Sequence, residues 1–163
     1  MAATSERADS FEEWFRELLP LARRVAARLA VEDPEDLVAE AFARAFVRWQ
    51  QVGGLPYRDA WLLRVLTNLG FDRARRARRR APAAATVHED DDVTARLVVR
   101  DAIGGLPRRQ REAISLRYLG DMSEAEVSRA LGVSRNTVKR HLDRARSTLR
   151  ARLADGWEEE GNS

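Results

Sequence analysis

The segment DMSEAEVSRALGVSRNTVKRHLDRAR, residues 121–146, has the spacing of a helix-turn-helix. Ser123 can cap a first helix, and Glu126, three residues later, completes a capping box. Gly132 can adopt the left-handed conformation that a tight turn needs, and Ser134 can cap a second helix. These residues predict two helices joined by a turn at Gly132.

The second helix of this motif has an apolar face and a basic face. Val133 is expected to plug the turn, and Val138, Leu142, Ala145 and Leu149 recur at helical spacing as a buried stripe. The opposite face carries five polar residues: Arg135, Asn136, Lys139, Arg140 and Arg144. Because Arg and Asn recognise base edges while Arg and Lys hold phosphates, the pattern predicts a recognition helix in the DNA major groove.

Charge is unevenly distributed along the 163 residues, although the net charge is only +3. Residues 93–153 carry 14 basic and 6 acidic side chains, and residues 73–80 contain six arginines. The stretches 81–92 and 154–163 each have a net charge of −4. Two basic segments separated by an acidic one are typical of two contacts on a single polyanion, which favours nucleic acid as the partner.

Several classes of protein are disfavoured by composition. The chain has no cysteine, and its two histidines, His88 and His141, lie far apart without carboxylates at ligand spacing, so no metal or other cofactor is expected. No nucleophile elbow, catalytic triad or phosphate-binding loop is present, so we do not expect an enzyme. No apolar run approaches the roughly 18 residues of a membrane span, and no signal peptide is evident. A soluble protein of the cytoplasm is the expectation.

The N-terminal half predicts a small helical bundle. An apolar stripe runs from Phe11 to Leu29, with a kink or break expected at Pro20. Asp33 and Pro34 predict the start of a second helix that ends near Gly53. A third helix is expected from about residue 59 to residue 78, buried through four apolar side chains: Trp61, Leu62, Val65 and Leu69.

Strand alternation is absent from the sequence, so we predict an all-α protein of two small helical domains joined by a flexible linker. The predicted boundaries are 1–80, an acidic linker at 81–92, four helices within 93–153, and a frayed acidic tail at 154–163. The four helices are expected at about 93–103, 108–118, 123–131 and 135–153.

The segment AWLLRVLTNLGFDRARRARRR, residues 60–80, combines an apolar helix with an arginine run. Aromatic side chains that stack on unpaired bases, next to arginines that contact phosphates, are typical of single-stranded DNA binding. Trp61 is better explained as a core residue. Asn68 differs, because its amide lies within an apolar helix and could hydrogen-bond a base.

The order of these motifs resembles that of an RNA polymerase sigma factor of the extracytoplasmic-function (ECF) type in the sigma-70 family. Residues 33–46, DPEDLVAEAFARAF, resemble the family's region 2.2, and residues 60–80 resemble regions 2.3 to 2.4. Residues 106–150 resemble region 4. The resemblance implies a transcription initiation factor without active-site chemistry, whose partners are core RNA polymerase and promoter DNA.

The resemblance also implies roles for individual residues. Region 2 would dock on the β′ clamp and capture the melted −10 element, while region 4 would bind the β flap and the −35 duplex. The implied polymerase contacts are Asp36, Leu37, Glu40 and Arg44. The implied −10 contacts are Asn68, Tyr57, Arg58, Arg73, Arg75 and Arg76. The implied −35 contacts are Arg135, Asn136, Thr137, Lys139, Arg140 and Arg144. An anti-sigma protein is the family's common regulator and would be a further partner; membrane insertion is not implied.

The chain departs from the family pattern at three positions. Ala39 replaces a usual glutamine, Asn136 a common glycine, and Ser128 a usual alanine. These changes affect promoter choice and affinity more than class. Two alternatives remain: a regulator that binds only duplex DNA through a response-regulator-like helix-turn-helix, and an interaction protein such as an anti-sigma decoy.

Overall fold

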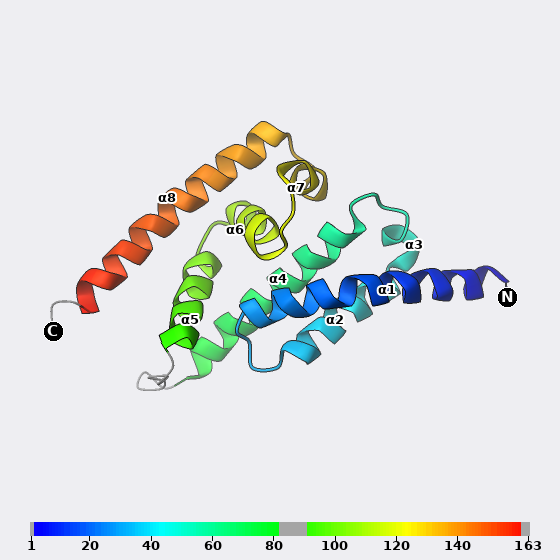
Figure 1. Ribbon diagram of the computed structural model, residues 1–163, viewed down its shortest axis with the longest axis horizontal. Helices are drawn as coiled ribbons and strands as arrows, with labels where there is room; N and C mark the ends of the chain where they lie inside the picture. Colours follow the sequence, from blue (N-terminus) through cyan, green and yellow to red (C-terminus); the bar gives the residue numbers. More distant parts are fainter. Residues whose placement is uncertain (1, 82–90, 161–163) are drawn as a thin grey trace.

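The computed structural model describes residues 2–81 and 91–160, and within these ranges the chain is helical without a β-strand. Figure 1 shows an elongated molecule in which α4 runs through the centre, with α1 to α3 on one side and α5 to α8 on the other. The elements are α1 (Ala2–Arg28), α2 (Pro34–Val47), α3 (Trp49–Val52), α4 (Arg58–Arg80), α5 (Asp91–Gly104), α6 (Arg108–Ile114), the π-helical turn η1 (Ser115–Leu119), α7 (Glu124–Leu131) and α8 (Arg135–Glu160). The all-α prediction is confirmed.

The first body is built from α1 to α4 around an aromatic cluster. Trp14 of α1 is 2% exposed and packs against Phe42 and Trp49, whose rings lie 5.5 and 4.9 Å from its own. The indole N–H of Trp14 donates a 2.6 Å hydrogen bond to Asp59 Oδ1 at the start of α4. The cluster therefore fixes the position at which α4 begins.

The start of α2 follows its sequence signals. Asp33 accepts a hydrogen bond from the backbone N–H of Asp36, and Pro34 occupies the first helical position. The expected break at Pro20 does not occur, since α1 runs continuously past this exposed residue. Gly53 ends α3, where an added Cβ would lie only 2.8 Å from the Trp49 ring.

The helix-turn-helix has the predicted geometry. Ser123 and Glu126 form the capping box in full, and Gly132 adopts the left-handed conformation with φ of 66°. Ser134 Oγ accepts from the backbone N–H of Thr137 at 3.1 Å, which caps α8. The stripe Val138, Leu142 and Ala145 is fully buried, whereas Val133 and Leu149 are only half-buried.

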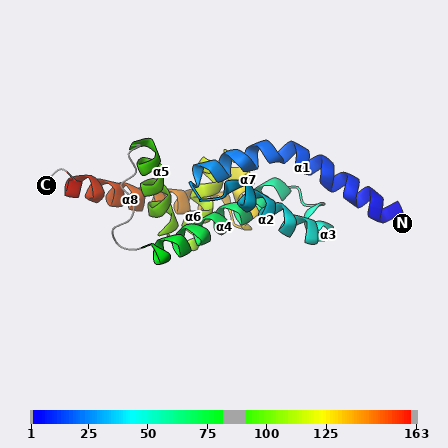
Figure 2. The same ribbon diagram turned by 90° about the horizontal axis from the view of Figure 1, so that it is seen from below.

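Burial along α4 differs from the prediction. Leu62, Leu63 and Leu66 are fully buried, whereas Trp61, Val65 and Leu69 are only partly so. The reason is that α4 packs on two sides, against α1 and α2 and also against α5, α6, η1 and α7. Figure 2 shows α5 and α8 toward one end of the molecule and α1 and α3 toward the other, with α4 in the middle. The two bodies therefore meet along this helix.

Three predicted boundaries need correction. The linker prediction, 81–92, lies mostly outside the described residues, but Asp91 and Asp92 already belong to α5. The tail was expected to fray from residue 154, yet α8 continues to Glu160. Helix α6 ends at Ile114, and the chain continues as η1 rather than as one α-helix to residue 118. Within the described ranges, none of the helices is both long and apolar enough to cross a membrane.

Candidate nucleic-acid interface

The basic face of α8 is open to solvent. Arg140 donates a 3.3 Å hydrogen bond to Thr137 Oγ1, which itself lies 3.0 Å from Ser134 Oγ. The predicted −35 residues that are exposed are Arg135, Asn136, Lys139, Arg140 and Arg144, while Thr137 is half-buried. Because the capping hydroxyl and Arg140 are linked through Thr137, the first turns of α8 present a preorganised donor surface.

Contacts from η1 and α7 hold this helix in place. Tyr118 Oη of η1 accepts hydrogen bonds from Arg146 Nε at 2.9 Å and Nη2 at 2.6 Å, and the hydrogen bond to Tyr118 raises the pKa of Arg146. Ser128 Oγ donates a 2.6 Å hydrogen bond to the carbonyl of Val133 across the turn. These bonds fix the position of α8 relative to the rest of its body.

His141 lies on the edge of the basic face. Burial lowers its pKa below the usual 6.5, and the neighbouring cations Arg144, Arg109 and Arg140 lower that pKa further. The imidazole of His141 is therefore less readily protonated than an ordinary histidine side chain.

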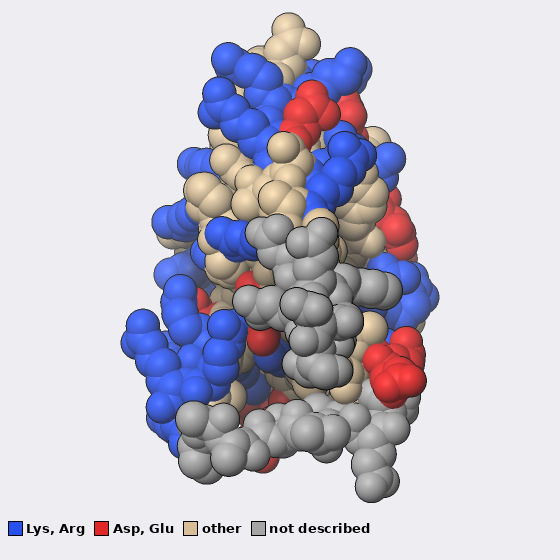
Figure 3. All heavy atoms as spheres, turned by 90° about the vertical axis from the view of Figure 1, so that its left-hand side faces the viewer, with Lys and Arg blue, Asp and Glu red and all other residues tan. Residues whose placement is uncertain are grey.

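The end of α4 forms the second basic surface. Arg75 pairs with Asp72 one turn earlier, whereas Arg76 is exposed. Figure 3 views the molecule from the end where α4 finishes and shows dense groups of Lys and Arg side chains over this face. Such a surface suits the phosphate backbone of a nucleic acid, because several guanidinium groups can release counterions together.

The other predicted −10 residues differ in how they are held. Arg58 donates to the Gly53 carbonyl at 3.0 Å and lies over the Trp49 ring, while Tyr57 is half-buried. The amide of Asn68 is not free, since its Nδ2 donates to Glu112 Oε1 at 3.1 Å.

The predicted polymerase-docking residues on α2 form one charged cluster. Glu40 pairs with Arg44 at 2.7 Å and with Arg73 of α4 at 2.6 Å, and Asp36 also pairs with Arg73. The hydrogen bond from Arg73 is the main cause that lowers the pKa of Glu40. Leu37 does not belong to this surface, because its side chain is fully buried and faces the core of the first body.

Sequence reasoning missed the residues that connect the two bodies. Arg64 donates to the Ala130 carbonyl at 2.9 Å, and Arg28 donates to the Leu119 carbonyl at 3.1 Å. Glu112 is a buried acid, 1% exposed, beside Asn68. The sequence signal that pointed to this region was the amide of Asn68 within an apolar helix. No group of three His, Cys, Asp or Glu side chains within the described ranges is close enough to bind a metal.

A helix-turn-helix with an exposed basic face, next to an arginine-ended helical body, defines a DNA-binding protein. Comparison with known families refines this class. Residues 14–80 match the family model of sigma-70 region 2, and residues 96–149 match that of sigma-70 region 4. The RNA polymerase sigma-E factor of Streptomyces coelicolor is 34% identical over 151 residues, covering 88% of this chain and 85% of that protein.

A second relative is the ECF RNA polymerase sigma factor SigW of Bacillus subtilis, which is 29% identical and is matched over 78% of its length and 77% of this chain. The chain belongs to the sigma-70 family, in its ECF group. It is an RNA polymerase sigma factor that directs transcription initiation at promoters. The alternative of a regulator that binds only duplex DNA is not supported, because the first body matches region 2.

Two solved structures share the fold. The sigma factor RpoE of Bartonella quintana, solved in complex with the anti-sigma factor NepR, has a TM-score of 0.55 and covers 88% of this chain and 96% of its own. CnrH, solved in complex with the cytosolic domain of CnrY, has a TM-score of 0.61 and covers 91% of this chain and 95% of its own. Each is 24% identical to this chain, so the likeness concerns the fold alone.

Proposed function

We propose that this sigma factor contacts promoter DNA and polymerase through separate surfaces of its two bodies. Residues 1–80 dock on the β′ clamp and capture the melted −10 strand, and residues 93–153 bind the β flap and the −35 duplex. The observation that carries the division is the exposed basic face of α8, which is the second helix of a complete helix-turn-helix. The acidic segment between α4 and α5 acts as the linker, and Asp91 and Asp92, which begin α5, belong to the second body.

The docking role is assigned to the charged cluster on α2. Asp36, Glu40 and Arg44 are at least partly exposed, and two of them are acids, so the cluster can exchange its internal partners for basic groups of the polymerase. Leu37 is buried in the core beneath this surface, so it can position α2 but cannot contact the polymerase directly.

The −10 role is assigned to α4 and to the loop that precedes it. The assigned residues are Tyr57, Arg58, Asn68, Arg73, Arg75 and Arg76. An amide can hydrogen-bond an unstacked base, and the arginines can hold its phosphates, which is the chemistry of single-strand capture.

The −35 role is assigned to the basic face of α8. The assigned residues are Arg135, Asn136, Thr137, Lys139, Arg140 and Arg144. The exposure of all of them except the half-buried Thr137, and the capped start of the helix, support insertion into the major groove.

Regulation by an anti-sigma protein is a further part of the proposal. It is supported by the two neighbours of the same fold, each solved with a bound partner, one of them named as an anti-sigma factor. We also propose that the protein acts in the cytoplasm, on the nucleoid during initiation, and carries out no catalysis of its own.

Run-off transcription tests the proposal. Purified chain is combined with core polymerase and genomic promoter fragments, and promoter-dependent transcripts are expected only when both proteins are present. Duplex binding without any transcript would support a regulator, and inhibition of another sigma factor alone would support a decoy. Either result would contradict the proposal.

The Asn68→Ala variant tests the −10 assignment. Open-complex formation should fall, while binding of a −35 duplex by the same protein should be largely retained, because α8 is far from the change along the chain. The matched control is Gln50→Ala, which removes an exposed amide of α3. Equal loss of both activities would contradict the role given to Asn68.

A further inference from the structure

An apolar cavity of about 280 Å³ lies where the end of α1, the middle of α4, α5 and η1 meet. Six apolar side chains line it: Leu29, Phe71, Ala95, Val99, Ile103 and Leu119. Ala95, Val99 and Ile103 follow one another at intervals of four residues, so a single face of α5 forms one wall. Concave, mostly apolar sites of this kind are where proteins bind small molecules.

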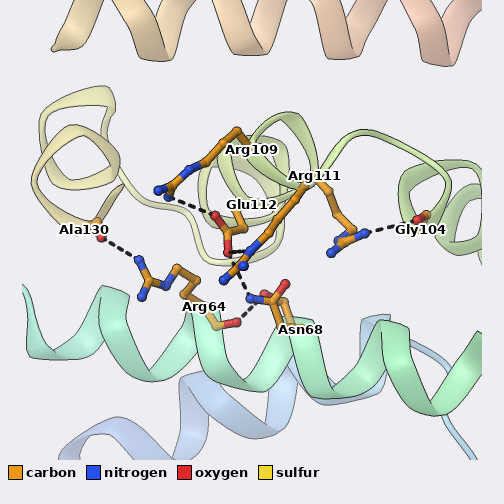
Figure 4. A network of polar contacts seen from close by, with 9 residues as sticks. Arg64, Asn68, Gly104, Arg109, Arg111, Glu112 and Ala130 are labelled. Carbon is orange, nitrogen blue, oxygen red and sulfur yellow. Dashed lines mark hydrogen bonds and ion pairs between the residues drawn. The ribbon is translucent and has the colours of Figure 1, made fainter. Parts of the chain in front are cut away.

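Two of the lining side chains, Leu29 and Phe71, are fixed by close packing. A Cβ added to Gly70 would lie 2.6 Å from Leu29 Cδ1, so Leu29 packs directly on the backbone of α4. A Cβ added to Gly104 would lie 3.5 Å from Phe71 Cδ1. Arg111 lies 5.9 Å from the centre of the Phe71 ring and donates to the Gly104 carbonyl at 3.4 Å (Figure 4). Neither side chain can fill the cavity without losing these contacts, so the space is preformed.

The cavity has a buried end and an open end. Leu29 and Phe71 are only 1% and 5% exposed, whereas Val99 is 43% exposed although it lines the same space. A ligand can therefore enter past Val99. Because removal of apolar surface from water is favourable, a hydrocarbon group that covers these side chains would be stabilised there.

The polar side chains that line the cavity are three arginines: Arg28 of α1, and Arg96 and Arg100 of α5. None of its described lining residues is acidic. The guanidinium of Arg100 already donates to the Ala30 carbonyl and to Asp101. Arg28 and Arg96 are about half-exposed, and since a guanidinium has five N–H donors, each can still donate to a ligand. The cavity therefore combines an apolar interior with positive charge and favours an anionic group on the ligand.

We propose that this cavity binds a small apolar carboxylic acid of about ten non-hydrogen atoms. The hydrocarbon part packs on Leu29, Phe71 and Ile103. The carboxylate pairs with Arg28 or Arg96, which are the exposed cations of the lining. The size follows from the volume, because apolar cavities of about 150 Å³ hold benzene and drug-sized ligands need about 300 Å³ or more.

This ligand site is additional to the proposed function. None of its described lining residues belongs to the sets assigned to polymerase, to the −10 strand or to the −35 duplex. Its test needs neither polymerase nor DNA, so its failure and the failure of the proposed function are distinguishable.

Calorimetric titration of the full chain tests the site. Octanoate and 3-phenylpropionate are the probes for straight-chain and aromatic acids, and at least one of them should bind once per chain. Octanamide, which has the same hydrocarbon part without the charge, should bind about tenfold or more weakly than octanoate if the straight-chain acid is the ligand. Acetate, which has the charge without the hydrocarbon part, should not bind measurably.

Two variants locate the binding. Ala95→Phe places a ring in the cavity from an exposed position of α5 and should abolish binding of the acid. Its matched control is Val98→Phe, because Val98 is exposed on the same helix but does not line the cavity. Arg96→Gln should weaken binding of the acid by about tenfold and leave octanamide unchanged. Arg16→Gln is the control for that change, since Arg16 and Arg96 each form an exposed ion pair with an acid four residues earlier.

Every other outcome contradicts the proposal. If neither acid binds the wild-type chain, the cavity is not a site for this class of ligand. Binding that survives Ala95→Phe, in protein whose circular dichroism remains helical, would place the ligand elsewhere. Equal affinity for octanoate and octanamide, or equal effects of Arg96→Gln and Arg16→Gln, would show that the arginines do not recognise the carboxylate.

Discussion

The guanidinium of Arg73 lies 2.6 Å from the carboxylate of Glu40, and the same Nη2 atom lies 2.7 Å from Asp36. This contact joins α4 to α2, and therefore joins the proposed −10 surface to the proposed polymerase surface. A basic group of the polymerase that binds Glu40 would compete with Arg73 for the same oxygens. If both proposed roles hold, polymerase docking and DNA contact would share these side chains.

Glu40→Gln should weaken binding to core polymerase while leaving the fold intact. The free energy of unfolding should change by less than about 1 kcal/mol, because partly exposed ion pairs contribute little. Glu35→Gln is the matched control, since Glu35 lies on the same helix and pairs with Arg23 at 3.1 Å, outside the proposed docking set. Affinity can be measured by fluorescence anisotropy and stability by urea denaturation. Equal affinities for the two variants would place the docking surface elsewhere.

Arg140→Ala should weaken binding of a −35 duplex by about 1–3 kcal/mol if its guanidinium contacts a base edge. Arg150, an exposed arginine farther along α8, provides the control substitution. Titration of both variants against duplex promoter fragments measures the difference. Unchanged affinity for Arg140→Ala would mean that another face of α8 enters the groove.

Arg76→Gln should lower affinity for promoter DNA similarly across sequences, because Arg76 is exposed at the end of α4 and is assigned to phosphates. The slope of log affinity against log salt should fall by about 1. Holoenzyme binding measured over a range of potassium chloride concentrations gives this slope. A change in promoter preference with an unchanged slope would instead indicate a base contact.

Much of the second body could be predicted because its signals are local. The capping box at Ser123, the left-handed Gly132 and the stripe from Val138 depend on residues a few positions apart, and the structure has each of them. The exposure of the α8 basic face follows directly from that stripe. Local rules therefore located the capping box, the turn and the start of the buried stripe of the helix-turn-helix.

The packing of α4 could not be predicted in the same way. A single apolar face was expected, but Leu63 contacts the second body while Leu37 and Leu29 lie close to Gly70 on the other side. The spacing of apolar residues shows which side of a helix is buried only when the opposite side faces solvent. A helix that packs on two sides has no such clear pattern. For the same reason the partner of Asn68, 44 residues away at Glu112, left no trace in local spacing.

Gly132→Ala should destabilise the second body by about 1–2 kcal/mol, because a Cβ is strained in the left-handed region. Its φ is 66° and no atom lies within 4 Å of the added Cβ, so the loss is conformational rather than steric. Gly54→Ala is the matched control, since its site is equally open and its φ is not in that region. Thermal denaturation compares the two. A loss of stability that is equal for both variants would contradict the backbone explanation.

Glu112→Gln should lower the free energy of unfolding by about 1–2 kcal/mol near neutral pH, because hydrogen bonds to an ionised group are replaced by weaker ones. Since the pKa of Glu112 is lowered below 4.5 in the folded chain, its ionised form stabilises the fold above pH 4.5, and this contribution is lost as the pH falls further. The difference between wild type and variant should therefore shrink below pH 4.5. Glu40 and Glu126, whose pKa values are also lowered, are present in both proteins and cancel in that difference. Urea denaturation at a series of pH values measures this difference in the free energy of unfolding. A difference that stays constant below pH 4.5 would show that the Glu112 carboxylate does not stabilise the packing of α6 against α4.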